Sequence, residues 1–405
     1  MDYAFPVISH INDILPAVAG RDEFIVVQKD GYQVVNYAVM MEDSFPVVNT
    51  VQLTNGDAVT DHMYETQADH FAALRRECRG LVFDLDGNLI NRRYHKFFNV
   101  NERDETRFEK VDFSQPHVIL EKLDGSMVSP CYVKGHVRYM TKMGITDTSM
   151  EAEVHTTRFQ IYREFAEYHL ARGWTPVYEW CSNKNRIVLS YPEDRLILTA
   201  MRRMDTGAYM PYQEMVELCE YWDIPLVKAY DYQDENILDI VRNLEDTEGV
   251  VIRFDDGHML KVKADWYVLR HKSKDAITRE KNVLDYVVNE RVDDVLPFLQ
   301  AEDQARLLKF QTDFWKGVDR IAAAYKTYID RITVDRKTWA TEHLPARKLQ
   351  DPHMGTVVFS WYDGKDVKET LLNIIRKNIG TQTKINHNRY LWGSGTWTYN
   401  FDGDE

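Results

Sequence analysis

The spacing of apolar and polar residues divides the chain into a strand-rich part and a helix-rich part. Up to about residue 265, short apolar runs are bounded by turn residues, which is typical of strands. The predicted strands are residues 23–28, 32–37, 78–84, 136–140, 176–180, 195–204, 248–254 and 259–263. Helical spacing predicts helices at 66–77, 149–172 and 211–222. Beyond residue 265 the strand pattern fades and helical periodicity takes over, so we place a domain boundary near 265–275.

These elements predict an α+β fold with two domains. We expect residues 1–268 to form antiparallel sheets with flanking helices, and residues 269–405 to form an all-helical carboxy-terminal domain. A chain of 405 residues is long enough to give each domain its own apolar core.

One predicted strand leads into a turn that carries a lysine. The apolar residues 118–120 precede Lys122, and the apolar residues 127–128 follow Gly125. This pattern predicts a strand, a tight turn and a second strand paired as a hairpin, with Gly125 permitting the turn. A lysine at such a position can act as a nucleophile when its neighbours lower its pKa. The Lys-x-Asp-Gly pattern alone is weak, because a chain of this length contains it by chance about one time in twenty, and a solvated lysine is the alternative.

Further charged residues stand on predicted strands. Glu179 lies among apolar neighbours, and Glu248 heads an apolar strand. Lys261 and Lys263 share one face of their strand, because strand side chains alternate. Their mutual repulsion, worth a few tenths to about 1 kcal/mol, would be relieved by a shared anion. A solvated polar face is the alternative.

Composition and charge restrict the classes of function. The net charge of −14 argues against binding of nucleic acid through a general positive field, so any such binding must use local basic clusters. The four cysteines are scattered and form no Cys-x-x-Cys pair, which argues against a zinc site or a disulfide framework. The amino terminus has no signal pattern, and no apolar run has the length of a membrane span. We therefore expect a cytoplasmic protein without membrane association.

The charged residues follow one another in a recognisable order. Lys122, Glu179, Glu248 and the pair Lys261 and Lys263 resemble the ordered motifs of the covalent nucleotidyltransferases, which include polynucleotide ligases and messenger-RNA capping enzymes. Five further segments narrow the resemblance to the bacteriophage RNA ligase 1 family: residues 77–80, 96–99, 185–189, 265–268 and 335–338. The resemblance extends from about residue 75 to about residue 340. It implies that residues 1–268 are an adenylyltransferase (nucleotidyltransferase) domain.

The resemblance also implies a reaction. In this family a lysine attacks the α-phosphorus of ATP and forms lysyl-AMP, AMP then passes to a 5′-phosphate on RNA, and a 3′-hydroxyl finally displaces AMP. Each step is an in-line displacement at phosphorus, which requires positioning of the groups and neutralisation of phosphate charge.

The family's functional residues map onto this sequence one by one. Lys122 corresponds to the adenylylated nucleophile, and Lys261 and Lys263 to residues that hold the α-phosphate and lower the pKa of that nucleophile. Arg79 and Lys96 match positions that grip the ATP phosphates and the ribose side. Lys142 matches another essential lysine, and Glu179 a residue that contacts the nucleotide and is needed for ligation. Phe98 and Tyr267 match base-stacking positions, with a core aromatic as the alternative for Phe98. Glu248 and Asp293 match metal-binding positions for Mg²⁺, with Mn²⁺ as a substitute, and Asp294 is the alternative to Asp293.

The implied partner is RNA with 5′-phosphate and 3′-hydroxyl ends, such as a nicked tRNA anticodon loop. The implied setting is RNA repair by a monomeric phage protein in the cytoplasm of an infected bacterial host. Arg336, Lys337, Arg347 and Lys348 lie near aromatic residues in the helical part, where they suit either RNA or a solvated helix face.

Two other functions stay open. A DNA ligase or a GTP-using capping enzyme would usually carry a β-barrel domain after Lys263, where this chain has a helical pattern. An inert RNA-binding protein of the same fold would need no nucleophilic lysine.

Overall fold

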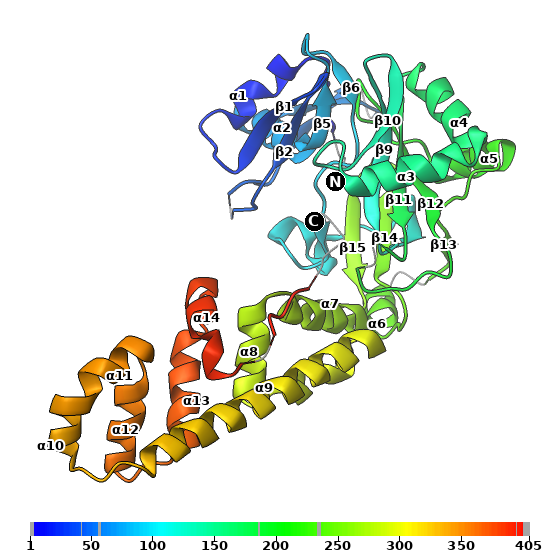
Figure 1. The fold of residues 1–405 in the computed structure, drawn as a ribbon. Helices are drawn as coiled ribbons and strands as arrows, with labels where there is room; N and C mark the ends of the chain where they lie inside the picture. The colour runs from blue at the N-terminus through cyan, green and yellow to red at the C-terminus, as the bar shows by residue number, and fades with distance from the viewer. Residues whose placement is uncertain are drawn as a thin grey trace. The chain divides into compact units, whose positions relative to one another are not determined.

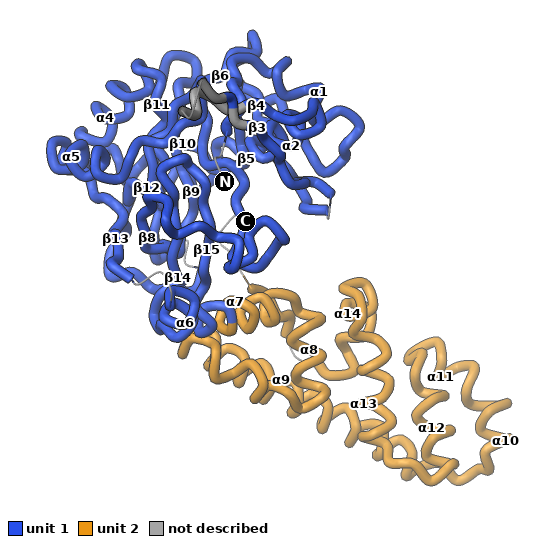
Figure 2. Tube along the Cα trace, turned by 180° about the vertical axis from the view of Figure 1, so that it is seen from behind, with its two compact units in different colours: residues 1–268, 402–405 blue, residues 269–401 orange. Residues whose placement is uncertain are grey.

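The computed structural model describes residues 4–41, 43–55, 58–184, 187–232, 236–393 and 395–399. The chain forms two compact units that divide between Val268 and Leu269 and are coloured separately in Figure 2. Sheets occupy the first unit, whereas the described residues of the second unit are helical (Figure 1). The predicted α+β class is confirmed.

The amino-terminal part of the first unit is a four-stranded antiparallel sheet in the order β1-β2-β5-β6. Its strands are β1 (Phe24–Lys29), β2 (Tyr32–Tyr37), β5 (Arg79–Phe83) and β6 (Leu89–Asn91). Two helices accompany this sheet: α1 (Leu15–Val18) and α2 (Gln67–Glu77). The strands β3 (Thr50–Asn55) and β4 (Ala58–Tyr64) form a separate hairpin. The core under the sheet is apolar and includes Phe45, Phe83 and Phe98.

Two further sheets complete the first unit. The order β10-β9-β11-β12 is built from β9 (Ser126–Val133), β10 (His136–Met140), β11 (Trp174–Cys181) and β12 (Arg195–Arg203). The order β13-β8-β14-β15-β7 is built from β7 (Phe98–Asn99), β8 (His117–Glu121), β13 (Ala229–Tyr230), β14 (Gly249–Phe254) and β15 (Met259–Lys263). Neighbouring strands are antiparallel except for the parallel pair β15 and β7. The remaining helices here are α3 (Asp147–Thr157), α4 (Gln160–Leu170), α5 (Tyr212–Trp222) and α6 (Ile237–Arg242).

The turn that carries Lys122 connects these two sheets. The predicted hairpin is wrong, because β8 pairs with β13 and β14 whereas β9 pairs with β10 and β11. The backbone N–H of Lys122 donates to the carbonyl of Gly249, which fixes the end of β8 against β14. Gly125 is required for close approach: a Cβ there would lie 2.4 Å from the carbonyl oxygen of Trp180. The sheet change therefore places Lys122 where both sheets contribute side chains.

The single helix predicted at 149–172 is two helices, α3 and α4. The chain leaves the helical conformation at Phe159, whose backbone is extended at φ −133° and ψ 94°. Both helices pack against the second sheet, and Tyr162 and Phe165 of α4 enter its core (Figure 1). The helical periodicity of the sequence continues across this break, so the pattern could not reveal it.

The second unit is a helical assembly around one apolar core. Its helices follow α7 (Asp265–Thr278), which begins in the first unit: α8 (Glu280–Val288), α9 (Ala301–Ile329), α10 (Arg336–Thr338), α11 (Leu344–Gln350), α12 (Met354–Tyr362), α13 (Val367–Asn378) and α14 (Gln382–Asn388). The carboxy-terminal segment contributes Trp392 and Trp397 to the core. Glu280 fixes this segment by pairing with Arg389 and accepting the backbone N–H of Trp397. Among the described helices, none combines the length and apolar character that a membrane crossing requires.

Candidate active site

A cavity of about 420 Å³ lies in the first unit, where the turn after β8 meets β11 and β15. It contains six of the predicted site residues: Arg79, Lys122, Lys142, Glu179, Lys261 and Lys263. The remaining lining mixes polar side chains, such as Thr141 and Thr199, with the apolar side chains of Leu120, Ile187, Val227 and Val251. The protein as a whole is acidic, so this cavity concentrates positive charge locally.

Glu248 holds two of the cavity lysines. Its carboxylate lies 2.7 Å from Nζ of Lys122 and 3.0 Å from Nζ of Lys263. The residue is 4% exposed. Burial alone would raise the pKa of this carboxyl, but Lys122 and Lys263 outweigh burial and hold the pKa below its ordinary value. Glu248 is therefore an ionised anchor for the nucleophile candidate.

Lys261 lies among other cations on the same side of the cavity. Burial, together with Arg79, Lys96 and Lys122, lowers the pKa of Lys261 to about 6. Its Nζ lies 5.3 Å from the centroid of the Phe97 ring. A bound anion would favour protonation of the Lys261 amine, so the arrangement suits a phosphate group.

A second group of cations surrounds Tyr37, at the end of β2. The ring centroid of Tyr37 lies 5.6 Å from Nζ of Lys96 and 5.8 Å from Nζ of Lys142. Burial, followed by the nearby Arg79, lowers the pKa of Lys96 to about 8. β5 passes close to the backbone of Lys142 at Gly80, where a Cβ would lie 2.7 Å from the Lys142 backbone. Glycine is required there for this reason and because its φ is +81°. Arg79, Lys96 and Lys142 thus form one cluster of positive charge.

Glu179 presents a carboxyl to the cavity from β11. Packing around that carboxyl raises its pKa to about 8, an effect that Glu248 reinforces and Lys122 opposes. Glu179 and Glu248 therefore differ in their ionisation although both face the same lysine. The environment assigns Glu248 the permanent charge.

Asp124 and Tyr267 form a buried pair behind the Lys122 turn. Both are 2% exposed, and the Tyr267 hydroxyl donates to Asp124 at 2.7 Å. The same carboxylate accepts the backbone N–H groups of Val188 at 2.7 Å and Leu189 at 2.6 Å. Asp124 consequently ties the nucleophile turn to residues 188–189 and to the start of α7. Tyr267 does not line the cavity, so its position suits a support for the turn better than a stacking surface.

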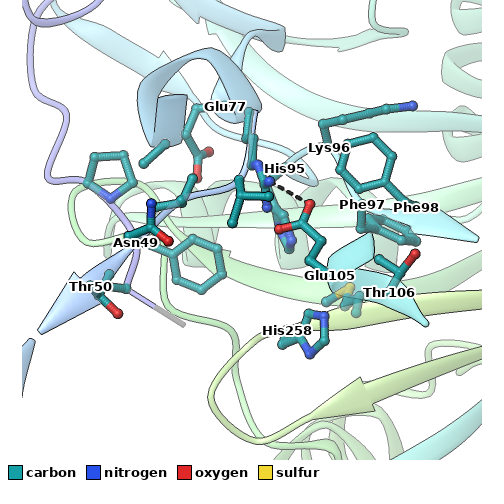
Figure 3. A pocket seen from close by; sticks show the side chains of 18 of the residues that line it. Asn49, Thr50, Glu77, His95, Lys96, Phe97, Phe98, Glu105, Thr106 and His258 are labelled. Atoms are coloured by element: carbon teal, nitrogen blue, oxygen red, sulfur yellow. Dashed lines mark hydrogen bonds and ion pairs between the residues drawn. The ribbon is translucent and has the colours of Figure 1, made fainter. Parts of the chain in front are cut away.

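Phe98 lies in the core of the first sheet rather than in this cavity. It is 2% exposed, and the guanidinium of Arg103 covers its ring at 4.4 Å. Phe98 lines a separate cavity of about 360 Å³. Lys96 also borders that cavity, but its side chain points away from the centre (Figure 3). Phe97 borders both cavities and lies beneath Arg79 and Lys261. Phe97 is therefore better placed than Phe98 to contact a ligand.

Several predicted residues are structural or lie elsewhere. Glu77 of segment 77–80 is buried, where its carboxylate pairs with the buried Arg92 and Arg202. Asp293 lies in the short 3₁₀ helix Val292–Asp294 of the second unit and is exposed. Residues 185–186 of segment 185–189 lie outside the described residues.

A metal ion would find hard oxygen donors beside Lys122 but no complete site. The carboxylates of Glu248 and Glu179 are ligands of the type that Mg²⁺ prefers. Among the described residues, however, no cluster of three acidic, histidine or cysteine ligands occurs. The donors therefore fit a metal ion only when phosphate oxygens complete its shell.

Sequence reasoning missed Tyr37, Phe97 and the support role of Asp124. Tyr37 lies beside the cations because β2 pairs with β5, with Asn36 opposite Arg79. The residue pattern within each strand does not determine this pairing register. Phe97 precedes a strand of only two residues, so no alternation distinguished it from Phe98. The Asp124 contacts join residues far apart in the chain.

Comparison with known proteins finds RNA ligases. A family model described as RNA ligase matches residues 77–267. A protein assigned as an RNA ligase in Thermovibrio ammonificans is 30% identical over 262 residues, which cover 60% of this chain and 67% of the relative. RNA ligase 1 of bacteriophage TS2126 is 23% identical over 340 residues, which cover 80% of this chain and 84% of the relative. A solved archaeal ATP-dependent RNA ligase covers 87% of this chain and 95% of its own, with 16% identity and a TM-score of 0.41.

Proposed function

Because the chain belongs to the RNA ligase family, we propose that it is an ATP-dependent RNA ligase that joins 5′-phosphate and 3′-hydroxyl ends. One observation carries the proposal: Lys122 faces a cavity that combines several cations with apolar side chains, and the buried Glu248 holds Lys122 there. Such a lining matches a nucleotide, which has an apolar base and a charged phosphate chain.

The first step is the formation of lysyl-AMP. The amine of Lys122 releases a proton to solvent, attacks the α-phosphorus of ATP and forms the P–N bond. The bond from the α-phosphorus to the oxygen that bridges to the β-phosphorus breaks, and its electron pair leaves with pyrophosphate. Lys261 and Lys263 neutralise the α-phosphate oxygens. Arg79, Lys96 and Lys142 hold the departing phosphates. Burial lowers the pKa values of Lys96 and Lys261, and the negative charge of the phosphates favours the protonated form of both amines.

The second and third steps use the same cavity. A 5′-phosphate oxygen of RNA attacks the phosphorus of lysyl-AMP, the P–N bond breaks, and the Lys122 amine takes up a proton. A 3′-hydroxyl then attacks the RNA phosphate, loses its proton and expels AMP. Glu179 contacts the nucleotide during these steps, and the network of Asp124 and Tyr267 keeps the Lys122 turn in place.

A divalent metal ion, Mg²⁺ or Mn²⁺, would supply charge neutralisation on the phosphates when it is bound. Glu248 is the residue of the first unit that we assign to it, with phosphate oxygens as the remaining ligands. For Asp293 the same role stays a proposal from the family resemblance.

The base of ATP occupies the apolar part of the cavity. Leu120, Val227 and Val251 line that part, and Phe97 borders it from the side of the cations. We assign the stacking contact to Phe97 instead of Phe98, because Phe98 is covered by Arg103 and lies in the core.

We assign RNA selection to the second unit, residues 269–401. Arg336 and Arg347 stack over Phe359 and Tyr328 there, which supports a surface that combines charge with aromatic rings. A monomeric enzyme of phage origin that repairs nicked tRNA in the cytoplasm of its host is the fullest version of this proposal.

A sealing assay tests the proposal. Single-stranded RNA with a 5′-phosphate and a 3′-hydroxyl is incubated with the protein, Mg²⁺ and ATP, and joined products are separated on a denaturing gel. We expect joined RNA with ATP, none with GTP and none with Lys122→Ala. Joining of DNA ends alone would favour a DNA ligase, transfer of GMP would favour a capping enzyme, and RNA binding without any product would favour the inert binding protein.

A further inference from the structure

An open groove of about 450 Å³ lies next to the catalytic cavity, on the other face of β11. Helix α3 forms one wall and the end of β11 the other, and Trp180 forms part of its floor. Strand side chains alternate, so Trp180 faces the groove while its neighbour Glu179 faces the catalytic cavity. One strand thus borders both sites.

The groove is connected directly to the nucleophile turn. Trp180 pairs with Ser126 across β11 and β9, and its carbonyl oxygen is the atom that leaves no room for a side chain at Gly125. A molecule seated in the groove therefore lies beside the backbone that positions Lys122.

The wall and floor of the groove suit a flat ring. Met150 and Val154, one turn apart on α3, are 41% and 57% exposed although both are apolar. The His155 and Trp180 rings lie 5.0 Å apart at 57°. Exposed apolar side chains beside two adjacent rings form a surface on which a base can stack.

The charges of the groove suit a base and ribose more than a run of phosphates. Lys184 forms an ion pair with Glu151, and Asp194 accepts the backbone N–H of Asn183. Arg158, at the end of α3, is exposed and extends the lining. Carboxylates next to apolar side chains can accept amino groups of bases and the ribose 2′-hydroxyl, and one arginine can reach a single phosphate.

We propose that this groove binds one unpaired nucleotide of the RNA beside the ends being joined, with its base against Val154 and His155 and its phosphate at Arg158. The proposal rests on the proposed function, because it requires RNA ends to be brought to the cavity of Lys122. It is independent of ATP, which occupies the catalytic cavity.

Two substitutions on α3 test the groove. Arg158→Ala removes the phosphate contact, and Val154→Glu places a negative charge on the wall while keeping a good helix former at an exposed position. Arg163→Ala on α4 is the matched control for the first variant, because Arg163 is also exposed but lies outside the groove. Tyr221→Glu on α5, 83% exposed, is the control for the second.

Each variant is measured in two reactions: lysyl-AMP formation by intact mass, and joining of pre-adenylylated RNA to an acceptor at several RNA and salt concentrations. We expect both groove variants to form lysyl-AMP at the wild-type rate. Their KM for RNA should rise by about fivefold or more, the range of one lost base stack. For Arg158→Ala the slope of log KM against the logarithm of the salt concentration should also decrease by about 0.7. This is the value expected when one phosphate contact to a single strand is lost.

Wild-type KM values in both groove variants, with the wild type joining RNA normally, would overturn the groove and leave the proposed function intact. Failure of the wild type itself to form lysyl-AMP or to join RNA would instead overturn the proposed function. Equal effects of the control variants would also overturn the groove, because a general loss of positive charge would then explain them.

Discussion

Replacing Lys261 by methionine should stabilise the protein while it impairs the reaction. Burial and the neighbouring cations lower the pKa of Lys261 from the ordinary 10.5 to about 6. Between these two values the unfolded chain binds a proton that the folded protein does not, so the free energy of unfolding rises with pH across that window. The folded state of the wild type therefore carries a penalty at neutral pH, and this penalty shrinks towards pH 10.5.

The size of the penalty follows from the pKa difference. One pKa unit corresponds to 1.36 kcal/mol. Between the two pKa values the penalty scales with the distance of the pH below 10.5, so it is about 5 kcal/mol at pH 7 and about 1 kcal/mol at pH 9.5. Structural relaxation makes these upper limits. Because the Lys261 amine is neutral at both pH values, Lys261→Met loses no cation–π interaction with Phe97. The net change should remain stabilising at pH 7 and nearly vanish at pH 9.5.

Thermal and urea unfolding at pH 7 and pH 9.5 measure this difference, on protein whose intact mass shows no bound AMP. Lys309→Met, at an exposed position on α9, is the control and should show no such dependence on pH. The reasoning would be refuted if Lys261→Met were no more stable than the wild type at pH 7, or if its advantage grew towards pH 9.5.

Three further predictions follow from the site. Tyr267→Phe removes the hydrogen bond to the buried Asp124 carboxylate and should lower the free energy of unfolding by about 1.5–3 kcal/mol in urea titrations; an unchanged midpoint would contradict that contact. Glu248→Gln keeps the shape but not the charge that holds Lys122, so the rate of lysyl-AMP formation should fall by about two orders of magnitude, and a wild-type rate in stopped-flow or mass assays would exclude the anchor role. In the Lys122→Ala variant, calorimetry should find that the affinity for ATP falls by about tenfold between pH 7.5 and pH 9.5. Lys96 has a pKa of about 8 and binds phosphate in its protonated form, so it loses that proton over this range. A constant affinity would show that Lys96 does not contact the nucleotide.

Local patterns in the sequence were sufficient for most strands of the first unit. The alternation in residues 259–263 and the apolar run before Arg253 predicted β15 and β14 almost to the residue. The strands 32–37 and 136–140 coincide with β2 and β10. These elements are set by side-chain periodicity and by the turns beside them, which are properties of neighbouring residues.

Pairing over long distances could not be obtained in the same way. The hairpin expected around Lys122 is a connection between two sheets, because β8 finds its partner in β14, far along the chain. The break at Phe159 interrupts a helical pattern that continues on both sides. The strand pairing and the helix break depend on which surfaces pack together in the folded protein. The local spacing of apolar and polar residues does not determine that packing.

The candidate site follows the same division. The order of the motifs indicated Lys122, Glu179 and Lys261, and these residues do meet in one cavity. The placement of Phe98 in the core and of Phe97 beside the cations depends on how a short loop packs under Arg79 and Arg103. The motif residues were therefore visible in the sequence, whereas their supports were visible only in three dimensions.

The most direct test of the central claim is the intact mass of the protein after incubation with Mg²⁺, pyrophosphatase and either ATP or GTP. We predict a gain of one AMP with ATP, no change with GTP and no gain for Lys122→Ala. Pyrophosphate added after removal of the pyrophosphatase should release the AMP. A wild-type protein that starts unmodified and gains no nucleotide from ATP, or a Lys122→Ala variant that still gains AMP, would contradict the assignment of Lys122 as the nucleophile.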